Sequence, residues 1–134
     1  MGFFFKKSKG TETINPAFIA ISGEQLKNIL WYLVRETQRR YLDGSLIVSQ
    51  EVLFDYNDET YIAGIRYDKK AAKSAGETDF NRKYMSVYMD GRPKQFYMDP
   101  DSFYESASLK GVPVKTIETG IYVAKDEFGD HIGA

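Results

Sequence analysis

The chain has 134 residues, of which 43% are hydrophobic and 28% charged, a balance typical of a folded globular domain. Its 18 basic and 19 acidic residues leave a formal net charge of -1, so no overall positive field attracts nucleic acid or an anionic membrane, although local patches remain open. The absence of cysteine excludes disulfides, thiolate nucleophiles and cysteine-ligated metals, and it favours a cytoplasmic location.

The amino-terminal part of the chain carries three aromatic residues followed by two lysines. This order does not fit a signal peptide, and no apolar run in the sequence is long enough for a transmembrane segment. Phe3, Phe4 and Phe5 remain candidates for a weak membrane contact. We expect residues 1–15 to be loosely ordered, and residues 17–21 to form either a short strand or an apolar lead-in to the next element.

The longest periodic segment of the chain runs from Ser22 to Gly44. Its apolar side chains recur at helical spacing, at Leu26, Ile29, Leu30, Leu33, Val34, Thr37 and Tyr41. Ser22 and Gln25 have the spacing of a capping box, Ile21 and Leu26 that of a hydrophobic staple, and Gly44 can end the helix. We predict a helix of about 20 residues whose apolar face the rest of the chain must cover.

After Gly44 the hydrophobic period changes from that of a helix to that of a strand. Alternating residues from Leu46 to Tyr56 predict a long strand with one mostly apolar face. A two-residue turn at Asn57-Asp58 would pair Phe54 with Tyr61 and place the apolar residues of both strands on one side. A slip of one residue would separate them, so the pattern supports this register.

Residues 68–79 are polar and small, and they show no apolar period. We predict a mobile surface loop. Lys69, Lys70 and Lys73 in this segment are most simply solvated; recruitment of an acidic partner is the alternative.

A second hairpin is predicted around Asp90-Gly91, a favoured two-residue turn. It would pair Val87 with Lys94 and Met85 with Phe96. The face toward the helix then contains Met85, Val87, Met89, Phe96 and Met98, with Arg92 and Lys94 at the loop end. The opposite face contains Tyr84, Ser86, Tyr88, Gln95 and Tyr97. Pro93 cannot donate a backbone hydrogen bond, so its strand lies at an edge or carries a bulge.

The remaining residues predict a second helix and further β-structure. Asp99 is a good N-cap and Pro100 a good first helical residue, which predicts a short helix through about Leu109. Residues 114–125 are rich in β-forming side chains, with either a bend or a small hairpin at Thr119-Gly120. We expect residues 126–134 to be loosely ordered.

Catalytic motifs are weak in this sequence. The single histidine, His131, lies near the end of a glycine-flanked tail, where a catalytic triad or a zinc site has no support. Two groups of carboxylates are candidates for Mg²⁺ binding or acid–base chemistry: Asp55, Asp58 and Glu59, and Asp99, Asp101 and Glu105. Turn formation and helix capping explain both groups better. We predict no catalytic residue, no metal and no cofactor, with a metal-dependent hydrolase as the less favoured alternative.

Ten tyrosines are more than a core of this size requires, and tyrosine suits surfaces that are half buried and half wet. The candidate binding residues are Tyr84, Tyr88, Gln95, Tyr97, Arg92 and Lys94. An ordinary half-buried sheet face and the stacking of single-stranded nucleic-acid bases are the alternatives.

These observations predict a single α+β domain over residues 1–134. One long N-terminal helix packs on a bent antiparallel sheet of four to six strands, and a short second helix precedes the last strand or strands. We expect a small, cytoplasmic, non-catalytic protein-binding module, of the size of bacterial or phage inhibitors, immunity factors and adaptors. Its partner is another protein or a second copy in a homodimer, and a single-stranded nucleic acid is the alternative ligand.

Overall fold

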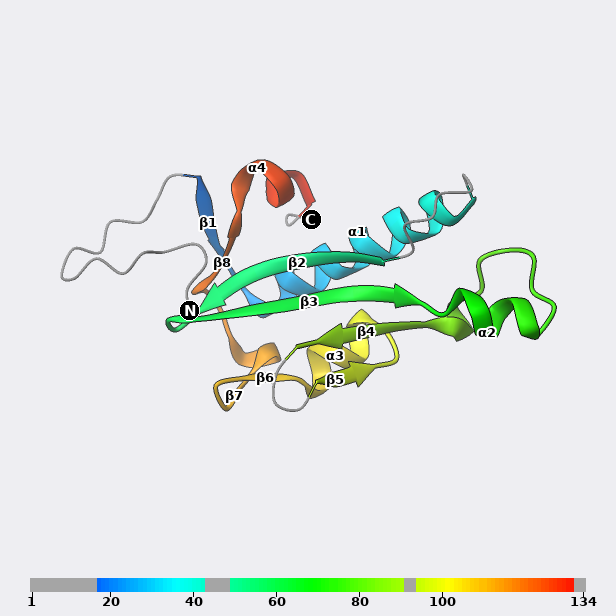
Figure 1. The fold of residues 1–134 in the computed structure, drawn as a ribbon. Coiled ribbons are helices and arrows are strands. Elements are labelled where there is room, and N and C mark those ends of the chain that lie inside the picture. Colours follow the sequence, from blue (N-terminus) through cyan, green and yellow to red (C-terminus); the bar gives the residue numbers. More distant parts are fainter. Residues whose placement is uncertain (1–16, 43–48, 91–93, 132–134) are drawn as a thin grey trace.

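A computed structural model of the protein describes residues 17–42, 49–90 and 94–131 (Figure 1). Its elements in chain order are β1 (Phe18–Ile21), α1 (Gly23–Leu42), β2 (Ser49–Tyr56), β3 (Glu59–Tyr67), α2 (Lys69–Ser74), the 3₁₀ turn η1 (Arg82–Tyr84), β4 (Met85–Met89), β5 (Gln95–Tyr97), α3 (Pro100–Ser106), β6 (Ser108–Leu109), β7 (Val112–Pro113), η2 (Val114–Thr116), β8 (Ile121–Ala124), α4 (Lys125–Phe128) and η3 (Gly129–His131).

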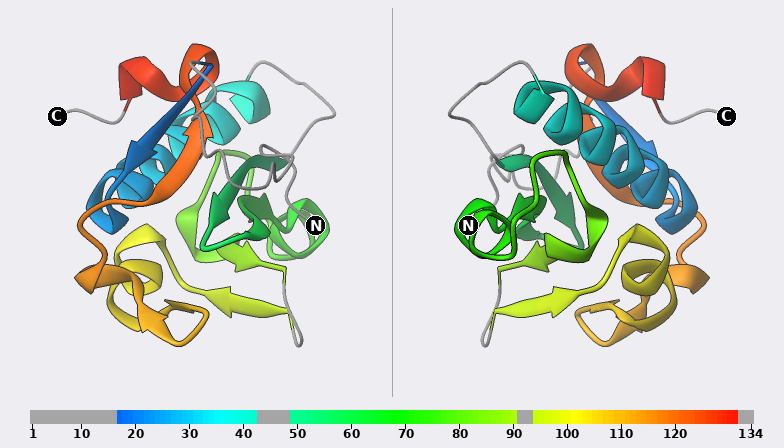
Figure 2. Two further views of the ribbon diagram at one scale, coloured as in Figure 1. Left: turned by 90° about the vertical axis from the view of Figure 1, so that its left-hand side faces the viewer. Right: turned by 90° about the vertical axis from the view of Figure 1, so that its right-hand side faces the viewer.

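Six of the strands form one antiparallel sheet in the order β1-β8-β2-β3-β4-β5, and β6 and β7 pair separately. β1 and β8 run steeply across the direction of β2 and β3, so the sheet is strongly bent (Figure 1). α1 and α3 lie together on one face of the sheet (Figure 2). This arrangement confirms the predicted α+β fold. None of the helices in the described part of the chain has the length and apolar character needed to cross a membrane.

α1 begins at the predicted capping box. The Ser22 amide donates to Gln25 Oε1 at 2.9 Å, and the Gln25 amide donates back to Ser22 Oγ at 3.0 Å. Both residues of the predicted staple, Ile21 and Leu26, are buried. The predicted apolar stripe is buried from Leu26 to Thr37 and half-buried at Tyr41; Gly44 lies outside the described residues. α1 is therefore the helix that closes the core over the sheet.

The hairpin of β2 and β3 has the predicted register, with Phe54 opposite Tyr61 and Val52 opposite Ala63. Asn57 and Asp58 have φ values of 51° and 70°, the left-handed values that a type I′ turn requires. Residues 46–48 of the predicted strand lie outside the described residues. This hairpin provides the two longest strands of the sheet and the floor on which α1 packs.

The prediction of a mobile surface loop over residues 68–79 is wrong, because this segment begins with the short helix α2. The Asp68 side chain accepts a hydrogen bond from the Ala71 amide at 3.0 Å and caps the helix. Gly76, with φ of 82°, ends it in a Schellman arrangement in which the Glu77 amide donates to the Ala72 carbonyl at 3.0 Å. Ala72 is buried and anchors α2 on the core.

The carboxy-terminal part differs from the prediction at three places. α3 has its predicted N-cap, because Asp99 accepts from the Ser102 amide at 2.8 Å, but it ends three residues earlier than expected, at Ser106. Within residues 114–125 only β8 is a strand in the main sheet, and η2 and a bend at Gly120 precede it.

Residues 126–131, expected to be loosely ordered, belong to α4 and η3 instead. The buried ring of Phe128 supplies the anchor, because it packs in the core beneath α4. The apolar residues 18–21 form a strand, β1, which settles the alternative left open for them. The other residues predicted to be loosely ordered, 1–15 and 132–134, lie outside the described residues.

Candidate functional site on the helix-free face

The register of β4 and β5 differs from the predicted one. Val87 lies opposite Tyr97 and Tyr88 opposite Phe96, so that residues 90–94 connect the strands in place of a two-residue turn. The difference from the predicted pairing is an odd number of residues, which turns each β5 side chain to the other face. The observed register packs Tyr97 edge-on against Phe103 at 5.3 Å. It also starts β5 at Gln95, after Pro93, which cannot donate to a ladder.

This shift divides the predicted tyrosine ridge between the two faces of the sheet. Gln95 and Tyr97 lie on the side of α1, where the Tyr97 hydroxyl donates to Gln95 Oε1 at 2.7 Å. Tyr84 is half-buried in η1 and packs against the core. Phe96 and Met98, predicted as core residues, are 54% and 74% exposed. The prediction of one face for all three tyrosines is therefore wrong.

Two cations, Arg92 and Lys94, belong to the predicted site. Lys94 lies on the same face as Tyr88, because its ammonium stands 5.5 Å from the centre of the Tyr88 ring. The predicted register placed Lys94 on the opposite side, toward the helix, which was wrong. Arg92 lies outside the described residues. Of the six predicted site residues, the structure thus brings Tyr88 and Lys94 together on the helix-free face.

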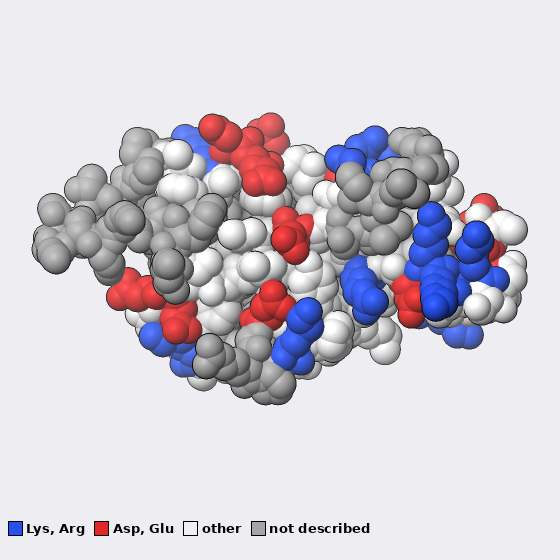
Figure 3. Space-filling view, in the orientation of Figure 1, with Lys and Arg blue, Asp and Glu red and all other residues white. Residues whose placement is uncertain are grey.

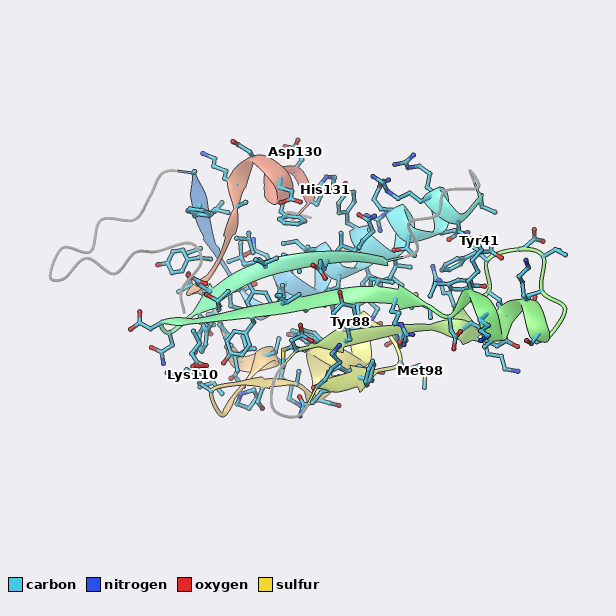
Figure 4. The ribbon with its side chains drawn as sticks, in the orientation of Figure 1. Tyr41, Tyr88, Met98, Lys110, Asp130 and His131 are labelled. Atoms are coloured by element: carbon cyan, nitrogen blue, oxygen red, sulfur yellow. The ribbon has the colours of Figure 1, made fainter. Side chains whose placement is uncertain are left out.

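A row of four residues crosses this face at its centre. Glu51, Gly64, Tyr88 and Phe96 lie opposite one another on the neighbouring strands β2, β3, β4 and β5. The Tyr88 hydroxyl reaches across β3 and donates to Glu51 Oε2 at 2.5 Å (Figure 4). We call these four residues the cross-strand row.

Gly64 makes this reach sterically possible. A Cβ atom at Gly64 would stand 2.8 Å from the Tyr88 hydroxyl oxygen and 2.6 Å from the Gln50 carbonyl oxygen. Neither distance is tolerated by a real side chain, so only glycine leaves room for the phenol to cross β3. The ring of Tyr88 is consequently held at both ends, by its own strand and by Glu51.

The electrostatics of the row keep Tyr88 neutral. Burial of the phenol raises the pKa of Tyr88 most, the hydrogen bond to Glu51 raises it further, and the negative charges of Glu51 and Asp90 add to the effect. The hydroxyl therefore remains a hydrogen-bond donor at neutral pH. With its hydroxyl bonded to Glu51, Tyr88 forms a fixed, uncharged platform on this face.

A groove of about 740 Å³ lies over and beside this platform. Its lining residues are the acidic Glu51, Asp68 and Asp90, the basic Arg66, Lys69, Lys70 and Lys94, and the aromatic Tyr67, Tyr88 and Phe96. Lys94 and Asp90 form an ion pair at 3.4 Å. Basic side chains gather at the α2 end of this face, which Figure 3 shows in blue.

Several of the carboxylates named from the sequence have structural partners. Asp55 is buried and accepts from the Thr60 hydroxyl at 2.7 Å. Asp101 accepts from the Trp31 indole at 2.8 Å, and Glu105 lies 3.3 Å from the Lys115 ammonium. In the parts of the chain that the structure describes, no three histidine, aspartate or glutamate side chains are grouped so that they could hold a metal ion.

His131 stacks on the Tyr32 ring at 3.7 Å.

The sequence contained a signal for the residues that its interpretation missed. A glycine inside an alternating strand, such as Gly64, indicates close approach of another group. Because the approaching group comes from β4, only the sheet register identifies it as Tyr88. The cations of α2 were noticed but placed in a loop, and their position beside β3 depends on tertiary structure. No protein-family model, no curated protein and no solved structure matches this chain.

Proposed function

We propose that this protein is a small non-catalytic protein-binding module that binds its partner with the groove on the helix-free face. The observation that carries this proposal is the exposed ring of Phe96, 54% exposed, beside the fixed platform of Tyr88. Inhibitors, immunity factors and adaptors of this size work by binding alone. The lack of cysteine in the sequence supports a cytoplasmic location for it.

The composition of the groove supports a protein partner. Aromatic residues and arginine are enriched at the centres of protein interfaces, and rigid aromatic side chains lose little entropy on binding. Tyr88 is already held by Glu51, so contact with its ring costs little ordering. Phe96 offers a large apolar surface at the edge strand β5, where a partner reaches it without disturbing the core.

Affinity capture from the native host tests this proposal directly. The tagged wild-type chain should retain a specific protein, and the Phe96→Ala variant should lose it, because the exposed ring contributes to the interface. Arg35→Ala is the matched control, since Arg35 is exposed on α1 at the other face. A partner that binds Phe96→Ala as well as wild type would contradict the assignment of this face.

A second copy of the chain is one form that the partner can take. If the groove mediates a homodimer, sedimentation should show self-association of the wild type and a monomer for Phe96→Glu. A dimer that persists in Phe96→Glu would have to use another surface.

A single-stranded nucleic acid is the second candidate ligand, and one observation favours it. Lys94 stands over the Tyr88 ring, on the same face as Arg66 and Phe96, so cations and aromatic rings occur together as in base-stacking platforms. Binding of oligo(dT) should then fall steeply with salt. The absence of binding at about 50 mM salt, where such contacts are strong, would eliminate this candidate.

A further inference from the structure

The charges of the groove are not evenly balanced along its length. Arg66, Lys69 and Lys70 lie at its α2 end, and none of them has an ion pair with another described residue. Lys94, nearer to β5, is already paired with Asp90 at 3.4 Å. The free positive charge therefore belongs to the α2 end.

Asp68, which precedes Lys69 in the chain, forms no ion pair with these three cations within the described residues. The Asp68 side chain accepts from the Ala71 amide at 3.0 Å and is committed to the cap of α2. The other end of the groove is formed by Tyr88 and the exposed Phe96, whose rings offer apolar surface. The groove thus has one end suited to carboxylates and one end suited to an apolar side chain.

We propose that the partner inserts a peptide segment that is acidic at one end and apolar at the other. Its carboxylates meet Arg66, Lys69 and Lys70, and its apolar side chain lies against Phe96 and Tyr88. This inference rests on the proposed function, and it adds the chemical class of the partner segment and its direction in the groove.

The acidic groups in the groove favour a peptide over a polynucleotide. Glu51 and Asp90 line the groove together with the cations, and Glu51 remains an acceptor for Tyr88. A polynucleotide carries a negative charge at every residue, so some of its phosphates would approach these carboxylates and be repelled. A peptide can carry its acidic side chains at one end alone, where they meet only the α2 end.

Selection from a phage-displayed library of random 12-residue peptides on the full chain tests this inference. The selected peptides should combine aspartate or glutamate with an aromatic or large aliphatic residue. As synthetic peptides they should bind the Lys69→Glu/Lys70→Glu variant about tenfold more weakly than wild type, because two favourable charge contacts become repulsive. Their affinity should also fall with added salt.

Two matched controls separate charge from general surface effects. Lys73→Glu reverses an exposed lysine on the same helix that does not line the groove, and it should leave the affinity nearly unchanged. Leu42→Ala removes an exposed apolar residue elsewhere and is the control for Phe96→Ala, which should weaken binding.

The outcomes distinguish this inference from the proposed function. Selected peptides without acidic residues that need Phe96 would overturn the inference and leave the proposed function standing. Equal binding to wild type and to Lys69→Glu/Lys70→Glu would overturn it in the same way. If no peptide is selected and oligo(dT) binds the groove, both the inference and the protein-binding function are wrong. If neither ligand binds, the result counts against both.

Discussion

Gly64 is the residue on which the helix-free face depends most directly. It occupies a strand interior, where glycine normally weakens a sheet, and in return it lets Tyr88 cross β3 to Glu51. Glu51 is packed equally closely against this glycine, because its Cβ lies only 2.9 Å from the position that a Cβ at Gly64 would take. One small residue therefore fixes the positions of two larger ones.

Replacement of this glycine should be costly. Gly64→Ala should lower the free energy of unfolding by roughly 1–3 kcal/mol, because backbone at Gln50 and the Tyr88 hydroxyl must both move. Urea denaturation measures the loss. Gly129→Ala is the control, since its nearest neighbour would be Lys125 Cγ at 3.6 Å, an ordinary contact. Equal stability of the two variants would show that β3 accommodates a side chain at this point.

The raised pKa of Tyr88 has a consequence at alkaline pH. The folded chain keeps the Tyr88 proton at pH values where an unfolded tyrosine, with a pKa of about 10, has lost it. The folded state then binds more protons than the unfolded state, so stability must fall as the pH rises above about 10.

Tyr88→Phe should reduce this alkaline loss of stability, because phenylalanine has no proton to retain. It should not abolish the loss, since burial also raises the pKa values of Tyr61, Tyr67 and Tyr97. Urea midpoints measured from about pH 8 to pH 11 provide the comparison. Parallel curves for wild type and variant would mean that Tyr88 ionises normally in the folded chain.

Among the elements, those that combine local end signals with a long hydrophobic pattern were predicted correctly. α1 has a capping box and an apolar stripe, and the β2–β3 hairpin has a type I′ turn between two alternating strands. α2 was missed because six residues are too short for an apolar period, although Asp68 and Gly76 mark its two ends. For short helices the caps are thus the more informative signal.

β5 was predicted as an element but with the wrong faces. Asp90-Gly91 is a strong signal for a two-residue turn. Pro93 and the packing of Tyr97 on Phe103 oppose such a turn, and the Tyr97 contact depends on tertiary structure that local sequence rules do not include. The binding residues taken from that register shared the error. Tyr88 and Lys94 were nevertheless placed on the correct hairpin, because its existence depends on alternation alone.

Two alanine variants test the observed register. Tyr97→Ala should destabilise the fold by about 1–3 kcal/mol, because it removes a ring that contacts Phe103 on the core side. Phe96→Ala should change stability by less than about 0.5 kcal/mol, because the Phe96 ring is exposed. The predicted two-residue turn would require the reverse order. Thermal or urea unfolding of both variants distinguishes the two registers.

On the scale of the whole molecule, the sheet is closed by segments from distant parts of the chain. β8 lies between β1 and β2, and α4 and η3 follow it on the α1 side of the bend (Figures 1 and 2). His131 stacks on Tyr32 of α1, and the Phe128 ring lies in the core. This strand order was not predicted, because four-residue strands carry too little pattern to identify their neighbours.

The residues after β8 should therefore contribute to the stability of the whole fold. Phe128→Ala should lower the free energy of unfolding by roughly 3–5 kcal/mol, as expected for removal of a buried aromatic ring. Asp130→Ala is the control, because Asp130 is exposed in η3. A loss below about 1 kcal/mol for Phe128→Ala would mean that this segment contributes little to the fold, as the sequence had predicted.

The pairing of β1 with β8 also determines when the fold can be completed. Phe18 and Ala124 face each other although about 100 residues separate them along the chain. During synthesis the β2–β3 hairpin and α1 can meet early, but the edge formed by β1 has no neighbour until β8 has left the ribosome. Closing so long a loop is slow, so we expect β1–β8 docking to be the last and rate-limiting step of folding.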